Sequence, residues 1–164
     1  MDLRFLFPWL LFVHVLGAIL AFGPTFAFSI IGSMGGQEPQ HANFATRVSQ
    51  TIGKRLVEPL AILQGITGVL LIWVSGRNLL GSESRWLILA IVLYVAALYF
   101  SLFIQGRWVS RIIEMTSAPP PPGAAGPPPG LAALVTNVQR GGMILGITVV
   151  VIVFLMVVKP SLGA

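Results

Sequence analysis

The residue with the clearest potential for chemistry is a histidine inside an apolar stretch. His14 lies within the sequence FVHVLGAILAFGPTF, which runs from Phe12 to Phe26. A neutral imidazole can bind iron or relay a proton, whereas an ionisable side chain in hydrocarbon is costly without a partner. His14 is therefore a candidate for a metal ligand, a proton-pathway residue or a hydrogen-bonded structural residue.

Small and polar residues accompany His14 along the chain. The helical face of His14 continues through small or polar residues, namely Gly17, Ala21, Thr25 and Ser29. A rise of about 1.5 Å per residue from the expected helix ends brings one polar residue of each other span to the same depth, namely Gln64, Tyr94 and Thr148. The sequence therefore predicts an internal polar layer. Its candidate cofactor-contacting residues are His14, Gly17, Gln64 and Tyr94.

These residues leave three hypotheses open. In the first, His14 bonds to Tyr94 or Gln64 and fixes a helix bundle. In the second, His14 is the axial ligand of a b-type haem iron. In the third, a polar path from Tyr94 to Gln105 carries an ion or a proton. The only other histidine, His41, lies in a polar segment, so a haem held by two histidines of one chain is disfavoured.

Motifs of common enzyme classes are absent from the sequence. It contains no nucleophile elbow, P-loop, HExxH motif or pair of intramembrane carboxylates. It also contains no cysteine, which excludes disulfides, thiolate metal sites and cysteine nucleophiles. We therefore assign no catalytic residue and favour a non-enzymatic protein. A redox reaction would need a bound cofactor to supply its chemistry.

The elements that must position these residues follow from composition. The chain has 164 residues, of which 55% are hydrophobic and 9% are charged, and its mean hydropathy is +0.89. A helix needs about 20 mostly apolar residues to span a bilayer. Four windows satisfy this length, with soft edges: residues 5–31, 56–74, 86–104 and 143–158. The sequence therefore predicts an all-α, polytopic membrane protein, a four-transmembrane-helix bundle that forms one domain over residues 1–164.

The connecting segments differ in character. We expect residues 32–53 to form a polar loop that contains a short interfacial helix at 42–49. The segment 75–85 is short, which makes the second and third spans antiparallel neighbours. Residues 117–130 read SAPPPPGAAGPPPG, and their seven prolines predict a solvated linker of the polyproline type. Residues 131–140 are expected to form a helix that leads into the last span.

The positions of the basic residues predict the orientation of the protein in the membrane and do not indicate nucleic-acid binding. The ten Lys and Arg residues give a net charge of +5, but they are scattered among the loops without a basic patch. One side of the membrane would carry Arg47, Lys54, Arg55, Arg107, Arg111 and Arg140. The other would carry Arg4, Arg77, Arg85 and Lys159. The larger group predicts the cytoplasmic side, with both termini outside and with Trp9, Trp73 and Trp86 near the outer interface.

Several motifs resemble a known family. HVLGA in the first span, LVEPLAILQGITGVLL in the second, Trp86 at the start of the third and VVVIVFLMVVKP in the last are similar to a bacterial family of integral membrane proteins. This family is the domain of unknown function twenty-two sixty-nine. The resemblance implies a multi-pass protein of the bacterial cytoplasmic (inner) membrane.

The layout is also similar to HemJ-type protoporphyrinogen oxidases and CopD-type copper resistance domains. In the HemJ type, a histidine followed three residues later by glycine ligates haem, and His14 and Gly17 match this pattern. A lysine expected after Trp86 is replaced by Ala90, and an expected Asn-Glu motif reads TNVQRGGM. The resemblance therefore implies haem b as an alternative cofactor without implying oxidase activity. The sequence has no cluster of Met or His residues that could bind copper, so it does not support CopD-type copper handling.

The leading hypothesis is thus a small integral membrane protein with an internal polar layer around His14. Its expected partners are the lipid bilayer and either other membrane subunits or further copies of itself. A haem-binding or porphyrin-binding redox protein is the alternative. A minor role in ion or metal transport is the third.

Overall fold

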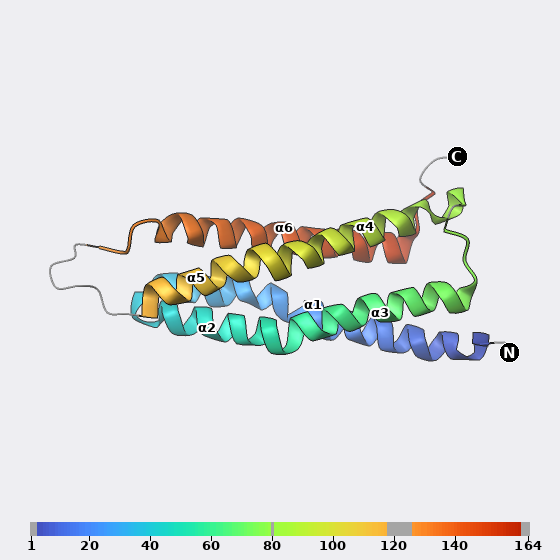
Figure 1. The fold of residues 1–164 in the computed structure, drawn as a ribbon, viewed down its shortest axis with the longest axis horizontal. Helices are drawn as coiled ribbons and strands as arrows, with labels where there is room; N and C mark the ends of the chain where they lie inside the picture. Colours follow the sequence, from blue (N-terminus) through green and yellow to red (C-terminus); the bar gives the residue numbers. More distant parts are fainter. Residues whose placement is uncertain (1–2, 80, 118–125, 162–164) are drawn as a thin grey trace.

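The computed structural model describes residues 3–79, 81–117 and 126–161. Four long helical segments run along the molecule, as Figure 1 shows: Arg4–Gln37, Pro39–Ser75, Arg85–Ser117 and Leu131–Val158. Each is long and apolar enough to cross a membrane. The described residues contain no strand, so the predicted all-α, four-helix fold is confirmed. Each predicted span lies within one of the four segments.

The first segment begins with a short 3₁₀ turn, η1 (Leu3–Leu6), and continues as α1 (Phe7–Gln37). Pro8 lies in its first turn, where a missing N–H costs nothing. Pro24 lies inside α1, which continues through it without a break. The second segment begins directly after Glu38, with the 3₁₀ turn η2 (Pro39–His41) and α2 (Ala42–Ile52).

The expectation of a polar loop over residues 32–53 is wrong, because nearly all of it is helical. Gly35 is one reason, since it allows α1 and α2 to close tightly. A Cβ atom at Gly35 would lie only 3.2 Å from the Cβ atom of Ala45. Asn43 of α2 also donates hydrogen bonds to Thr116 Oγ1 at 2.8 Å and to the Ile113 carbonyl at 3.3 Å. These contacts satisfy polar groups that the sequence alone assigns to solvent.

A π-helical turn, η3 (Gly53–Val57), joins α2 to α3 (Glu58–Ser75). Pro59 accounts for it, because proline has no N–H for the carbonyl four residues back and its ring clashes with that turn. The Glu58 N–H instead bonds to the Gly53 carbonyl, five residues back. The second segment thus remains continuous to Ser75 and ends at Gly76, whose φ of 63° needs glycine.

The third segment follows a 3₁₀ turn, η4 (Ser82–Ser84), and consists of α4 (Arg85–Phe100), the π-helical η5 (Ser101–Gln105) and α5 (Gly106–Ser117). The last segment is α6 (Leu131–Val158). The helix expected at 131–140 is confirmed as the beginning of α6. Residues 118–125 of the proline-rich linker lie outside the described residues, and residues 126–130 form bends and turns.

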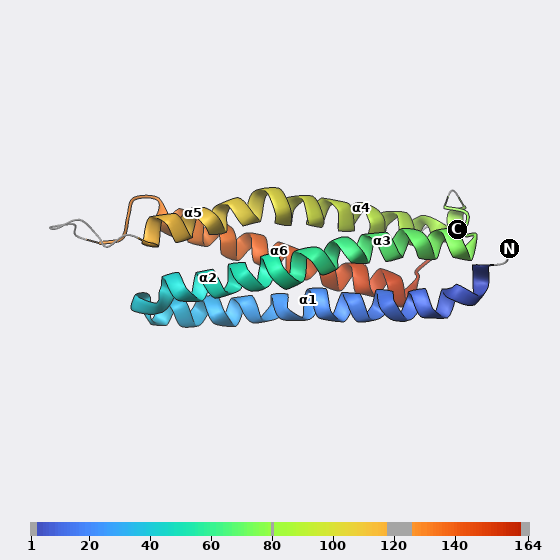
Figure 2. The same cartoon turned by 60° about the horizontal axis from the view of Figure 1, so that its bottom comes forward.

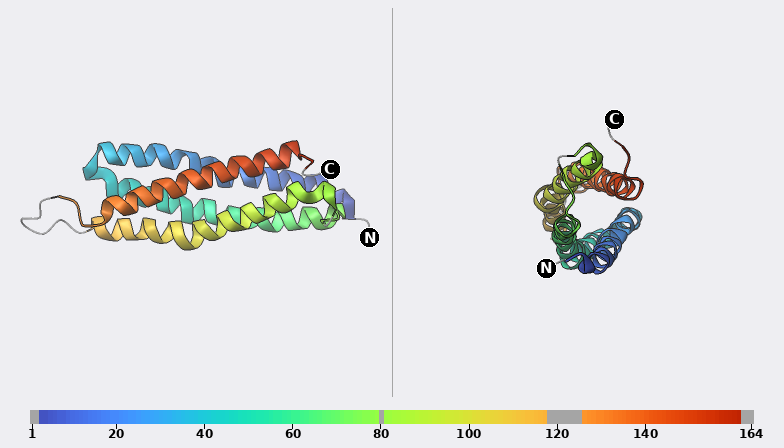
Figure 3. Two further views of the ribbon diagram at one scale, coloured as in Figure 1. Left: turned by 90° about the horizontal axis from the view of Figure 1, so that it is seen from above. Right: turned by 90° about the vertical axis from the view of Figure 1, so that its right-hand side faces the viewer.

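The helices associate as pairs. At the end that carries both termini, α1 packs along α3 and α4 packs along α6; at the other end, α2 packs against α5 (Figures 1 and 2). The end-on view in Figure 3 shows the two pairs side by side. Helices α2 and α5 differ from the others because they are amphipathic. Many large apolar side chains of the other helices are exposed, as lipid contact requires.

A small apolar cluster lies between α4 and α6, formed by Trp86, Leu87, Ala90 and Leu155. Trp86 is only 7% exposed, so it packs inside the bundle at the end that carries Trp9 and Trp73, and its predicted place near the outer interface stays a prediction. Trp9 and Trp73, at 70% and 68% exposure, do face outward. Ala90 is fully buried against this cluster, so a longer side chain at this position would have no room.

Candidate functional site

The predicted inward face of α1 is correct near His14 and wrong farther along. Gly17 and Ala21 are buried, and His14 is partly buried. Ser29 is exposed, and its hydroxyl donates to the Phe26 carbonyl of its own helix at 3.0 Å. Thr25 likewise bonds within its own helix. The predicted face is therefore buried at Gly17 and Ala21, partly buried at Thr25 and exposed at Ser29.

His14 is hydrogen-bonded at both ring nitrogens by residues of α3. The Gln64 amide nitrogen lies 3.0 Å from His14 Nε2, and Thr67 Oγ1 lies 2.9 Å from His14 Nδ1. With the Gln64 amide nitrogen turned toward the ring, we assign the acceptor role to Nε2 and the ring proton to Nδ1. Thr67 accepts from Nδ1–H and donates its own proton to the Leu63 carbonyl at 3.0 Å. Donors and acceptors alternate consistently through this His14 cluster, which comprises His14, Gln64 and Thr67.

Glycines on the facing helices make room for these side chains. A Cβ atom at Gly17 would lie 3.0 Å from Gln64 Oε1, and one at Gly68 would lie 3.4 Å from His14 Cε1. Gln64 is 8% exposed, and its Oε1 atom is buried without a hydrogen-bond partner. The close approach of α1 and α3 therefore depends on Gly17, as the predicted role of small residues requires.

Tyr94 reaches α3 from the other helix pair. Its hydroxyl donates to the Ala61 carbonyl at 2.5 Å and lies 2.9 Å from the Cβ position of Gly65. Tyr94 thus lies near the predicted layer, but it makes no hydrogen bond to His14. Thr148 does not join the layer either, because its hydroxyl bonds to the Ile144 carbonyl of its own helix at 2.8 Å. The layer draws on three helices and not on four.

Gln105 makes a separate contact between the third and fourth segments. Its amide nitrogen donates to the Val138 carbonyl at 2.9 Å, and its Oε1 atom is buried without a partner. The Cβ position of Gly141 lies against this same oxygen. Tyr94 faces α3 whereas Gln105 faces α6, and no hydrogen bond among the described residues connects the two. The structure therefore gives the polar path hypothesis no continuous chain of side chains.

Thr67 is the residue of the cluster that sequence reasoning missed. It lies three residues after Gln64 and therefore shares its helical face. That spacing was a usable signal. Threonine hydroxyls in membrane helices commonly bond to their own backbone, and Thr67 does so while also accepting from His14.

The donor set of the cluster does not fit a haem in this packing. An axial ligand must direct one ring nitrogen at the iron. Here Nε2 of His14 faces the Gln64 amide and Nδ1 faces Thr67, and even a single Cβ atom at Gly68 would already be in van der Waals contact with the ring edge. Within the described residues, no three His, Asp or Glu side chains gather as a metal site. The cluster can hold α1 and α3 together through these hydrogen bonds.

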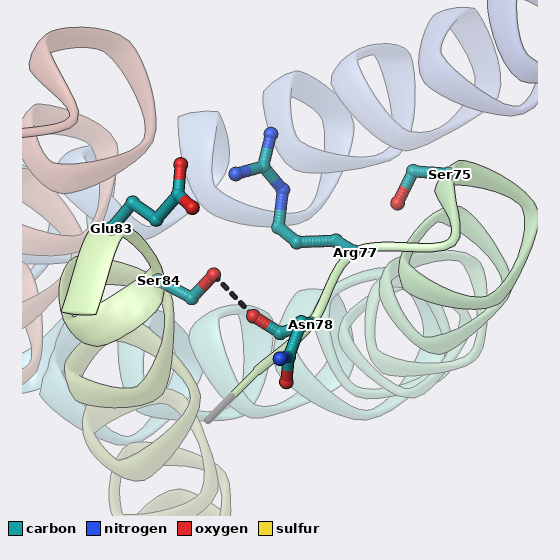
Figure 4. Close-up of a pocket in the computed structure, with 5 residues that line it drawn as sticks. All are labelled: Ser75, Arg77, Asn78, Glu83 and Ser84. Atoms are coloured by element: carbon teal, nitrogen blue, oxygen red, sulfur yellow. Dashed lines mark hydrogen bonds between the residues drawn. The ribbon is translucent and has the colours of Figure 1, made fainter. Parts of the chain in front are cut away.

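Two surface cavities lie away from the cluster, at the end that carries the termini. One, of about 440 Å³, is lined by Arg4, Phe7, Val74 and Ser75. The other, of about 240 Å³, is lined by Ser75, Arg77, Asn78, Glu83 and Ser84. Figure 4 shows the second cavity, where the Ser84 hydroxyl donates to the Asn78 carbonyl at 2.7 Å. This bond ties the loop after α3 to the start of α4.

The fold and the cluster define a class: an α-helical integral membrane protein with four spans and a hydrogen-bonded polar layer among α1, α3 and α4. The chain belongs to the family of predicted integral membrane proteins DUF2269, whose sequence model matches residues 8–160. Comparisons with curated proteins and with solved structures give no significant match. The similarity in layout to the HemJ and CopD types therefore stays a prediction.

Proposed function

We propose that this chain is a small, non-enzymatic membrane protein in which the His14 cluster joins α1 to α3, and that it serves as a subunit of a larger membrane assembly. One observation carries the structural role of His14: both of its ring nitrogens have partners on α3, at 3.0 and 2.9 Å. A histidine satisfied in this way has no free nitrogen for a metal or a substrate.

The surface of α1 supports the role as a subunit. Gly32 and Gly36 are exposed, and no heavy atom of another element lies within 4 Å of the Cβ position of either. Helices pair closely where small residues let their backbones approach. Within the described chain, this part of α1 is open to the approach of a helix from another protein.

Absorbance and stability together test the role of His14. The parent, His14→Gln and His14→Ala would be expressed with excess haem, purified in mild detergent and compared as oxidised and dithionite-reduced samples. We expect three colourless proteins, of which His14→Gln keeps more thermal stability because glutamine can still bond to Thr67. A Soret band in the parent that disappears in a folded His14→Ala protein would refute the structural role and support the haem-binding alternative.

The size of the assembly in native membranes tests the subunit role. We expect the parent to migrate on native gels as a species larger than one chain, and Gly32→Leu to release the monomer. Gly23 has the same empty surroundings, so Gly23→Leu reports whether release is specific to one face of α1. A parent that is monomeric at native expression levels would contradict this part of the proposal.

A further inference from the structure

Basic residues lie at both ends of three of the spans. Along the second, third and fourth segments, the pairs are Arg55 with Arg77, Arg85 with Arg107, and Arg140 with Lys159. The members of these pairs are 22, 22 and 19 residues apart. A rise of about 1.5 Å per residue converts these separations to about 28–33 Å. The hydrocarbon core of a bilayer is about 30 Å thick, so the pairs bracket one slab.

Hydrogen bonds between helices place the basic residues at the span ends farther from the termini at one level along the bundle. The Gln50 amide donates to Ser110 Oγ at 2.8 Å, which puts these two residues side by side on antiparallel helices. Lys54 lies about one turn beyond Gln50, and Arg107 lies about one turn before Ser110. Because the helices are antiparallel, both steps lead in the same direction along the bundle. Lys54 and Arg107 are therefore level to within about one turn, 5.4 Å.

The fourth segment joins the same level. The Gln105 amide donates to the Val138 carbonyl at 2.9 Å, and Gln105 also faces the Cβ position of Gly141. Arg140 lies between these two residues of α6, and Arg107 lies two residues from Gln105. We call Lys54, Arg55, Arg107 and Arg140 the basic ring. Its members come from three segments and occupy one level of the bundle.

The basic ring is exposed and carries no ion pair among the described residues. Glu58, one turn from Lys54, is the nearest carboxylate along the chain and makes no ion pair with it. Farther from the spans, by contrast, Arg111 pairs with Glu114 at 2.9 Å. The basic residues at the opposite end also have partners, since Arg77 and Lys159 lie 5.8 and 5.9 Å from the centre of the Trp86 ring.

We infer that the basic ring binds the phosphate groups of anionic phospholipids in one leaflet. Guanidinium and ammonium groups bind phosphate oxygens by charge-assisted hydrogen bonds, and each basic residue near an anionic leaflet adds attraction. The apolar spans then lie in hydrocarbon between the ring and the Trp86 end. The amphipathic helices α2 and α5, held together by Asn43–Thr116 and Gln50–Ser110, lie beyond the ring outside the hydrocarbon.

Lipid-dependent thermal stability of the purified full chain tests this inference. The protein in a mild nonionic detergent would be titrated with phosphatidylglycerol, phosphatidylcholine or inorganic phosphate, with unfolding followed by circular dichroism. The test variant is Lys54→Gln/Arg107→Gln. The charge-matched control is Arg47→Gln/Arg111→Gln, whose residues lie farther from the spans. We expect phosphatidylglycerol to stabilise the parent at lower concentrations than phosphatidylcholine does. In the test variant, the ratio of the two apparent affinities should fall about fivefold for each charge removed.

The control and a charge-conserving variant decide the outcome. Arg47→Gln/Arg111→Gln and Lys54→Arg/Arg107→Lys should both keep the preference for phosphatidylglycerol. Equal stabilisation of the parent by the two lipids would overturn the inference, as would an equal loss of preference in the test and control variants. Full stabilisation by inorganic phosphate alone would identify a site for free anions and would also overturn it.

Discussion

A single methyl group at Gly17 should separate Gln64 from His14. In a Gly17→Ala protein, the new Cβ atom would lie 3.0 Å from Gln64 Oε1, which is tighter than ordinary van der Waals contact. The Gln64 amide is planar, so displacing its oxygen also moves the nitrogen that donates to His14 Nε2 at 3.0 Å. Either α1 and α3 move apart or this hydrogen bond breaks.

The expected magnitude combines three terms. An interhelical hydrogen bond in a membrane contributes about 0.6 kcal/mol on average and about 1.7 at most. Overpacking a close contact costs about 1–3 kcal/mol. Alanine has a higher helix propensity than glycine, which offsets up to about 1 kcal/mol of this loss. We therefore expect Gly17→Ala to lower the free energy of unfolding by about 2 kcal/mol.

Unfolding by titration with sodium dodecyl sulfate, followed by circular dichroism, measures this change. Gly32→Ala is the matched control, because Gly32 lies on the same helix with no heavy atom near its Cβ position. We expect the control to be neutral or slightly stabilised. Equal stability of the two variants would refute the claim that α1 and α3 meet through Gly17 and the His14 cluster.

Other expected outcomes use the same unfolding assay. Gly141→Ala should destabilise by about 1–3 kcal/mol because its methyl group overlaps the buried oxygen of Gln105, whereas Gly142→Ala, with only an ordinary contact, should change little. An equal effect of the two would contradict that packing. Tyr94→Phe should cost about 0.5–1.5 kcal/mol through loss of the bond to the Ala61 carbonyl. Tyr99→Phe, on an exposed ring, should be neutral, and a matching loss there would argue against the Tyr94 bond.

The four spans were predictable because apolar composition is a local property of the sequence. The bounds of the second segment were not, because α2 is polar and its partners are distant. Asn43 bonds to Thr116, 73 residues away, and Gln50 bonds to Ser110, 60 residues away. No local pattern indicates such pairs, so the sequence alone favoured a loop.

The level of the site residues along the helices was predictable, but the side of each helix that faces its neighbour was not. Counting the helical rise placed His14 and Gln64 together, and they lie 3.0 Å apart. Which side of each helix faces its neighbour depends on packing, which the count does not contain. Tyr94 therefore lies near the expected level but bonds to Ala61. Thr148, at a similar calculated depth, bonds to its own helix.

Nitrogen-15 NMR of the His14 ring tests the central claim most directly. The sequence has only two histidines, so His41→Gln leaves His14 as the sole signal in a histidine-labelled protein in lipid nanodiscs. We predict a neutral ring at neutral pH, with its proton on Nδ1 and with Nε2 as an acceptor. Gln64→Leu should shift the Nε2 signal most. A ring protonated on Nε2 alone would contradict the account, and so would an Nε2 chemical shift that does not change in Gln64→Leu.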